Sequence, residues 1–148
     1  MIKLIQKQAI ILPNDQVTIV RYSLLGLINK ICVNVIYADV ENYHSHPWDY
    51  ISVILWGRYK ETQWKDGKTH TKTYYPGSIL KRKHDQFHRI VPIGEKAITL
   101  FFRGRAKTKS NYWVENNKVY PESKYWLMKG YTKDKMRKLF NYMKEYNN

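Results

Sequence analysis

Apolar and polar residues alternate along most of the chain up to Gly104. This period of two residues is typical of β-strands that bury one face. Turn-forming residues interrupt the pattern at short intervals, and Asp66-Gly67 is the strongest hairpin signal among them. The expected strands cover residues 10–13, 17–22, 31–40, 50–56, 58–64, 69–75, 79–82, 88–91 and 97–102.

Many short strands separated by turns predict a mainly β protein, an antiparallel sandwich or barrel. The chain has 148 residues, of which 43% are hydrophobic, and it contains neither an internal repeat nor a low-complexity linker. Such a length and composition suit one core. We therefore expect a single domain over 1–148, with the barrel in about 1–104.

The C-terminal part of the chain has a different pattern. Residues 105–131 gather aromatic side chains around Asn116-Asn117 and Pro121, which predicts an irregular or hairpin extension laid over the barrel. From Thr132, a plausible N-cap, apolar residues recur at i, i+3, i+4 and i+7. This spacing predicts one amphipathic α-helix over about 132–146, with Met136, Leu139, Phe140 and Met143 on its apolar face.

The net charge of +14 is distributed unevenly. Residues 1–57 hold four basic and four acidic side chains, whereas residues 58–148 hold the other 22 basic and eight acidic ones. A basic surface attracts acidic partners, either an anionic small molecule or nucleic acid. A lysine-rich surface that only keeps the protein in solution explains the charge equally well.

Several classes of protein are excluded by missing patterns. No apolar run is long enough to span a membrane, and the first residues do not resemble a secretory signal. The single cysteine, Cys32, cannot form an internal disulfide and is expected to be buried. We therefore expect a cytoplasmic protein. The sequence also lacks a P-loop, a dinucleotide-binding glycine motif, a cysteine-rich zinc motif and a serine-nucleophile motif.

The histidines are the strongest chemical signal. His44 and His46 are two residues apart, so on a strand both side chains point to one side. His88 begins another expected strand and can supply a third imidazole from across the barrel. We expect these three to bind a metal, and His70, in a polar run, to be exposed.

Three imidazoles suit a divalent transition metal: Fe(II), Mn(II), Ni(II), Zn(II) or Cu(II). Three protein ligands also leave coordination positions open, which distinguishes a catalytic site from a closed structural one. Without a cysteine ligand, the residues alone do not select among these ions.

Other polar residues near the histidines have more than one interpretation. Asp49 is either a fourth ligand or an acceptor that orients a ligand histidine, and strand parity favours the second. His84 is either a general base or a surface residue. The candidates for binding substrate are Arg82, which shares the parity of His88, Arg89, which points the other way, Arg103 near the rim, and Tyr50, which lines the interior.

This arrangement resembles the cupin superfamily over about Tyr43 to Gly104. The first cupin motif is matched by His44, His46, Asp49 and Gly57, and the second by Gly77 with His88 eleven positions later. The spacing from His46 to Asp49 is one residue shorter than usual, Ala38 replaces a glycine, and Lys83, Asp85 and Pro92 replace other usual residues.

The resemblance is strongest to small cupin-like proteins of bacteria and their phages. They share the run His44–Asp49, the run Ile54–Glu61, His88-Arg89 and Thr99–Gly104, and a similar aromatic tail. The resemblance implies a double-stranded β-helix barrel, a metal pocket that favours Fe(II), and a homodimer. It implies no particular reaction.

Three functional hypotheses follow. The first is a metal-dependent oxygenase or hydroxylase of the Fe(II) type, acting on a small anionic or nucleotide-like substrate. The second is a metal-free cupin isomerase or epimerase on a nucleotide-sugar, with a histidine as base. The third is a non-enzymatic module whose basic surface binds nucleic acid or an acidic protein.

Overall fold

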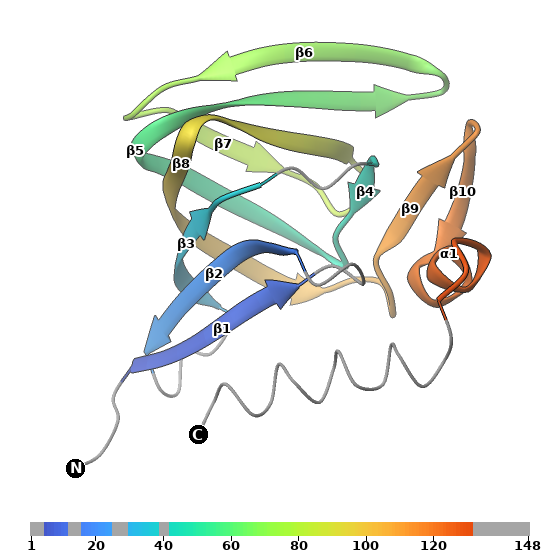
Figure 1. Cartoon of the computed structure of the whole chain (residues 1–148), viewed down its shortest axis with the longest axis horizontal. Helices are drawn as coiled ribbons and strands as arrows, with labels where there is room; N and C mark the ends of the chain where they lie inside the picture. Colours follow the sequence, from blue (N-terminus) through green and yellow to red (C-terminus); the bar gives the residue numbers. More distant parts are fainter. Residues whose placement is uncertain (1–4, 12–15, 25–29, 39–41, 132–148) are drawn as a thin grey trace.

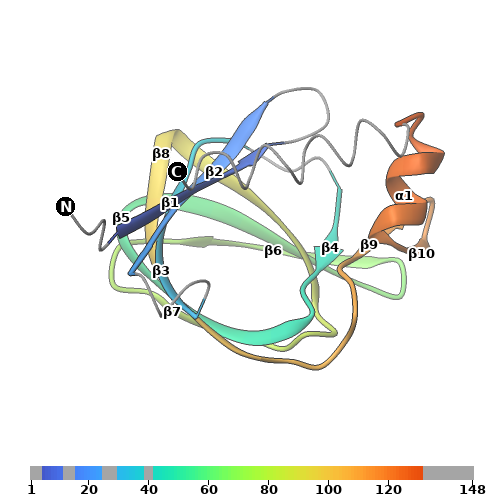
Figure 2. The ribbon, with the colours of Figure 1, turned by 90° about the horizontal axis from the view of Figure 1, so that it is seen from below.

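The computed structural model describes residues 5–11, 16–24, 30–38 and 42–131. Nearly all of its regular structure is one ten-stranded β-sheet, in which every pair of neighbouring strands is antiparallel. The strands curve around a common interior, as Figure 2 shows, and the sheet stays open. The prediction of a mainly β barrel-like fold is confirmed.

The elements follow the chain in a simple order. They are β1 (Ile5–Ile11), β2 (Val17–Leu24), β3 (Ile31–Ile36), β4 (His44–Ser45), β5 (Trp48–Lys65), β6 (Lys68–Tyr74), β7 (Ile79–Arg82), β8 (Phe87–Ala106), β9 (Tyr112–Glu115), β10 (Lys118–Pro121) and α1 (Glu122–Met128). The sheet runs β1-β2-β3-β8-β4-β9-β10, and β5 pairs with β6, β7 and β8 (Figure 1).

Two long strands, β5 and β8, form the frame of the barrel. The sequence pattern predicted two strands in place of each, because both bend sharply in the middle. The register of β5 against β8 shifts on both sides of Trp56, next to Gly57, which has a φ of +73°. A Cβ atom at Gly57 would lie 2.5 Å from the carbonyl oxygen of Lys96, so no other residue fits there without movement.

Turn residues define the hairpin of β5 and β6 as the sequence predicts. Asp66 and Gly67 both have positive φ, 50° and 79°. This is the backbone conformation of the favoured two-residue hairpin turn. His70 lies on β6 opposite Gln63 and is exposed, as predicted.

The core consists of two apolar clusters within the barrel. The larger one contains Ile36, Ile54, Tyr59, Leu80 and Ala97. The second contains Cys32, Tyr50 and Phe101, with Trp48 packed against it. Cys32 is 2% exposed, which confirms that it is buried.

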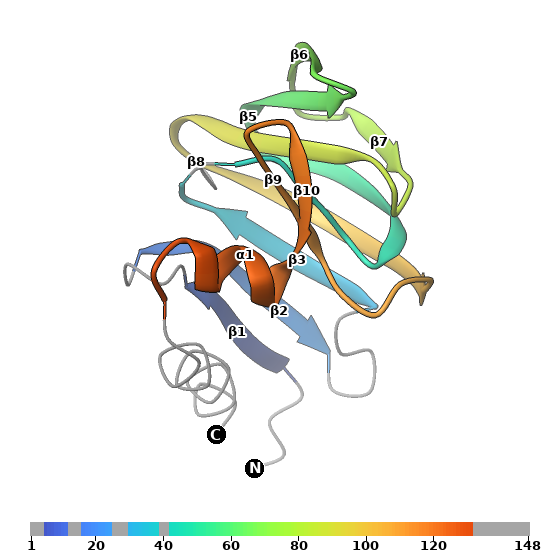
Figure 3. The ribbon, with the colours of Figure 1, turned by 90° about the vertical axis from the view of Figure 1, so that its right-hand side faces the viewer.

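Residues beyond the barrel continue the sheet. The strands β9 and β10 form a hairpin around Asn116 and Asn117, both with positive φ, and β9 pairs with β4. The hairpin was predicted, but the short helix α1 that follows it was not. The side chain of Tyr125 from α1 is buried and stacks on Trp113, with ring centroids 5.1 Å apart. Figure 3 shows α1 at the end of the β9–β10 hairpin.

The second C-terminal expectation, an amphipathic helix over 132–146, lies outside the described residues. Within the described part of the chain, no helix has the length and apolar character needed to cross a bilayer.

Candidate metal centre

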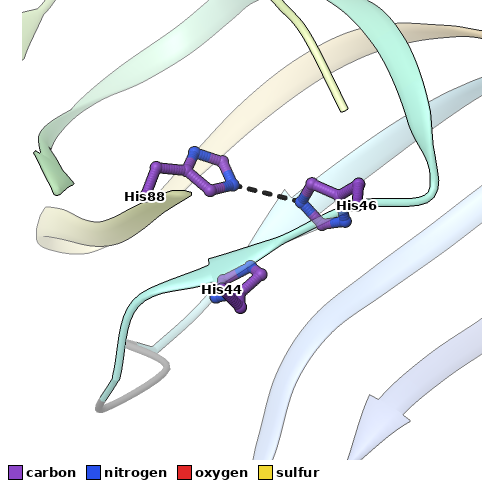
Figure 4. Close-up of side chains that lie close together, drawn as sticks. All are labelled: His44, His46 and His88. Atoms are coloured by element: carbon purple, nitrogen blue, oxygen red, sulfur yellow. Dashed lines mark hydrogen bonds between the residues drawn. The ribbon is translucent and has the colours of Figure 1, made fainter. Parts of the chain in front are cut away.

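Three histidines converge at one end of the barrel interior. His44 lies on β4 directly opposite His88 on β8, and His46 follows β4 by one residue. One ring nitrogen from each of the three lies within 4.8 Å of the others. The Nε2 atoms of His46 and His88 face each other at 3.1 Å (Figure 4). The structure therefore brings together the three residues predicted to be metal ligands.

The spacing of the His46 and His88 nitrogens suits a shared metal ion. Two imidazole nitrogens that are each about 2.0–2.1 Å from one ion are about 3 Å apart at ordinary coordination angles. In the absence of an ion, the 3.1 Å separation of His46 and His88 is a hydrogen-bond distance that needs only one proton between the two rings.

Burial favours the neutral form of His44 and His46. The pKa of His44 is lowered to about 3, mainly by burial and further by the neighbouring His88. The pKa of His46 is lowered well below its ordinary value, again mainly by burial, with smaller contributions from the charges of His44, His88 and Arg21. Only a neutral imidazole has a lone pair available to bind a metal, so the environment favours the ligand form.

Glu61 contacts the cluster from behind His88. Its Oε1 atom lies 2.8 Å from Nδ1 of His88, and the glutamate is 2% exposed. Burial raises the pKa of Glu61, but hydrogen bonds from His88 and Arg82 outweigh it and lower the pKa to about 2. The carboxylate is placed to accept a hydrogen bond from the Nδ1–H group of His88, while Nε2 of His88 faces His46.

Arg82 has a different partner from the one expected. Its Nε donates to Oε1 of Glu61 at 3.0 Å, its Nη2 also bonds to Oε2, and Nη2 donates to the hydroxyl of Tyr74 at 3.0 Å. The guanidinium predicted to hold a substrate therefore neutralises Glu61. The sequence signal for the burial of Glu61 is that it shares the strand parity of Tyr59, and both are buried on β5.

Asp49 lies on the outside of the barrel, as strand parity suggests. Its Oδ1 accepts from the backbone N–H of His84 at 2.9 Å and lies 3.0 Å from Nδ1 of His84. Its Oδ2 accepts from Lys107 at 2.6 Å. Asp49 therefore orients His84, whereas the expectation was that it orients His44 or His46, and the described carboxylate beside the cluster is Glu61.

The remaining predicted residues surround the cluster in different ways. Tyr50 is 8% exposed, and its hydroxyl lies 3.3 Å from Nδ1 of His88. The guanidinium of Arg103 lies 4.4 Å from the ring centroid of Trp48, which stacks on His46. Arg89 is half-buried on β8 beside His88 and opposite Thr62.

Searches with the sequence found no relative. No protein-family model matches the chain, and no curated protein matches it. Similarity appears only at the level of structure, where many solved chains match.

Three solved structures illustrate the similarity. An Fe(II)-HppE complex with the alternative substrate (S)-1-HPP has a TM-score of 0.57 at 10% identity, and the match covers 70% of this chain and 58% of that one. Hydroxypropylphosphonic acid epoxidase from S. wedmorenis has a TM-score of 0.50 at 12% identity, with 65% and 55% covered. Drosophila melanogaster CENP-C bound to CAL1 has a TM-score of 0.50 at 11% identity, with 58% and 70% covered.

These neighbours are cupin-domain proteins, and at such identities the similarity establishes the fold alone. The chain spans a little over half the length of the epoxidase structures that it matches. The protein therefore has the cupin fold.

Proposed function

We propose that this protein is a metal-dependent cupin enzyme in which His44, His46 and His88 hold a divalent transition metal. The observation that carries the proposal is the convergence of three imidazoles within 4.8 Å, with a buried carboxylate against Nδ1 of His88. Metal-ligating histidines usually donate their second ring N–H to such an acceptor. A histidine cluster with a purely structural role would not require a buried carboxylate at the second ring nitrogen.

Fe(II) is the ion that we favour, and oxygenase or hydroxylase chemistry is the reaction class. The support is the similarity in fold to an Fe(II)-HppE structure together with an all-nitrogen ligand set. When bound, such an ion supplies open coordination positions for substrate and dioxygen. The substrate that we propose is a small anionic or nucleotide-like molecule.

The side chains around the cluster perform supporting tasks. Glu61 holds the proton on Nδ1 of His88, and Arg82 keeps that carboxylate ionised. Trp113 packs on His44, with centroids 4.8 Å apart, and Trp48 stacks on His46 at 6.1 Å. These indoles exclude water from the cluster and so strengthen electrostatic interactions within it.

A titration with Co(II) tests this proposal. Metal-stripped full-length protein should bind one equivalent and develop the visible absorption of Co(II) bound by nitrogen ligands. The variant His44→Ala should lose that spectrum, while His70→Ala, an exposed histidine, should keep it. An unchanged spectrum in His44→Ala would show that Co(II) binds elsewhere and would refute the assignment.

A second candidate function is a non-enzymatic binding module. Figure 1 shows the hairpin of β5 and β6 at the top of the molecule. Four lysines of this hairpin are exposed: Lys60, Lys65, Lys68 and Lys72. The similar CENP-C structure is bound to a protein, CAL1. Affinity for DNA or RNA that falls steeply with salt would support this candidate through counterion release. Stoichiometric metal with no binding at low salt would refute it.

A further inference from the structure

Two arginines lie close to the histidine cluster without a carboxylate partner among the described residues. Arg21 is on β2 and Arg103 is on β8, on either side of the row formed by Ser23, Cys32 and Phe101. The guanidinium of Arg21 lies 5.4 Å from the ring centroid of Phe101, and that of Arg103 lies 4.4 Å from that of Trp48. Trp48 packs against the cluster of Cys32, Tyr50 and Phe101 and stacks on His46.

Strand register places the two arginine side chains on the same face of the sheet as Ser23, Cys32 and Phe101. Burial lowers the pKa of Arg21, Cys32 raises it, and the charge of Arg103 lowers it further. Both arginines are half-buried, and like charges that share one partly buried face are costly unless a counter-charge joins them.

The only side-chain hydrogen bond described for Arg21 is to a neutral group. Its Nε donates to Oδ1 of Asn34 at 2.9 Å. Arg82 provides a contrast inside the same barrel, because its charge is fully matched by the buried carboxylate of Glu61. Arg21 and Arg103 therefore leave a local excess of positive charge beside His46 that the described chain does not neutralise.

Three of the four buried side-chain atoms without a hydrogen-bond partner among the described residues belong to Arg103 or to residues next to the two arginines. The Nε of Arg103, the Nε1 of Trp48 and the hydroxyl of Ser23 are buried and have no hydrogen-bond partner. Ser23 is only 4% exposed and lies opposite Cys32, between the positions of the two arginines. Unsatisfied buried donors are rare in proteins, and three near one pair of cations are the complement of an oxyanion.

We propose that Arg21 and Arg103 bind the oxyanion group of a small molecule, a carboxylate or a phosphate, beside the histidine cluster. Ser23 and Trp48 donate further hydrogen bonds to this group. The assignment of that molecule as the substrate rests on the proposed metal-dependent function. The oxyanion site itself does not, because its residues are separate from the metal ligands.

The test is a calorimetric titration of the full-length protein with inorganic phosphate and, separately, with acetate. The titration is done with metal-stripped and with Co(II)-loaded protein, because phosphate and acetate can also coordinate Co(II). Comparison of the two separates binding to the arginines from binding to the metal. Wild type should bind at least one of the two anions. The anion that binds with the higher affinity shows whether the oxyanion group of the natural ligand is a phosphate or a carboxylate. Arg21→Gln and Arg103→Gln should each weaken binding at least about tenfold, as expected for loss of a charge-assisted contact.

The matched control is Arg58→Gln, which removes the same charge from an exposed site on β5. It should bind the anion as wild type does. Equal weakening in Arg58→Gln and Arg21→Gln would show general surface attraction and overturn the proposal, as would failure of wild type to bind either anion at millimolar concentration. Arg21→Lys should keep part of the affinity, which separates loss of charge from loss of folding.

Failure of this proposal is distinguishable from failure of the proposed function. If phosphate or acetate binds through Arg21 and Arg103 but Co(II) does not bind, the oxyanion site stands and the metal function fails. If Co(II) binds through the histidines and the arginine variants bind both anions normally, the metal function stands and the oxyanion site is refuted.

Discussion

The Oε1 atom of Glu61 lies 2.8 Å from Nδ1 of His88, in a part of the barrel where both side chains are almost completely buried. This contact connects the middle of β5 to the candidate metal centre, and it assigns the two nitrogens of His88 to different tasks. Nδ1 holds a proton for the carboxylate, and Nε2 faces His46.

Glu61→Gln should weaken metal binding by about 10–100-fold, because a carboxylate that accepts from a ligand histidine raises its basicity and fixes its orientation. Competition with a chelator of known affinity measures the effect. Glu95→Gln, an exposed glutamate at the bend of β8, is the control and should bind as wild type does. Equal affinity in Glu61→Gln and wild type would mean that the contact has no bearing on the metal.

Arg82→Met should lower the free energy of unfolding by about 3–5 kcal/mol, since it leaves the charge of Glu61 buried without its partner. Urea denaturation measures this loss. The double variant with Glu61→Gln should recover part of it, because the buried charge is then gone as well. A loss below about 1 kcal/mol in Arg82→Met would contradict the view that Arg82 is needed to neutralise Glu61.

The metal-free protein should lose stability as the pH falls below 6.5. The pKa of His44 is about 3 in the folded protein against 6.5 ordinarily, so the unfolded chain binds protons that the folded one does not. The pKa of Glu61 is lowered from 4.5 to about 2, so Glu61 also decreases the free energy of unfolding as the pH falls, but only below about pH 4.5. Unfolding measured between pH 6.5 and 4.5 should show a shallower slope for His44→Ala than for His70→Ala. Identical slopes would be inconsistent with a buried, neutral His44.

Gly57→Ala should destabilise the protein more than Gly94→Ala. Both glycines have positive φ, which costs an alanine about 1 kcal/mol or more. At Gly57 the added Cβ also meets the carbonyl oxygen of Lys96 at 2.5 Å, whereas at Gly94 nothing lies within 4 Å. Thermal unfolding of the two variants provides the comparison. Equal decreases in the unfolding temperature of the two variants would contradict the close contact between position 57 and the carbonyl oxygen of Lys96.

Much of the fold is visible in local sequence patterns. The turn at Asp66-Gly67 and the hairpin around Asn116-Asn117 depend on residues that tolerate positive φ, and such residues are recognisable by type. Each of the long strands β5 and β8 was predicted as two shorter ones. In the sequence, a glycine inside a strand, such as Gly57 in β5 or Gly94 in β8, looks like a turn between two strands. Helix α1 was missed because its seven residues owe their position to the packing of Tyr125 on Trp113.

The site could be predicted only where spacing along the chain carries the information. His44 and His46 share a face because they are two residues apart, and the same parity places Asp49 on the other face. The partners Glu61 and Arg82 are brought together by the pairing of β5 with β7 and β8, and Arg21 reaches the site through β2 and β3. The register between distant strands is set by tertiary packing, so the sequence pattern does not reveal it.

Elemental analysis of anaerobically purified protein tests the central claim most directly. Wild type, His46→Ala and His70→Ala would be purified side by side without added metal. We expect near-stoichiometric transition metal, with iron as the favoured ion, in wild type and His70→Ala, and a loss of at least about tenfold in occupancy in His46→Ala. Equal metal content in His46→Ala and wild type, or no metal in wild type even after reconstitution, would contradict the assignment of the three histidines as a metal centre.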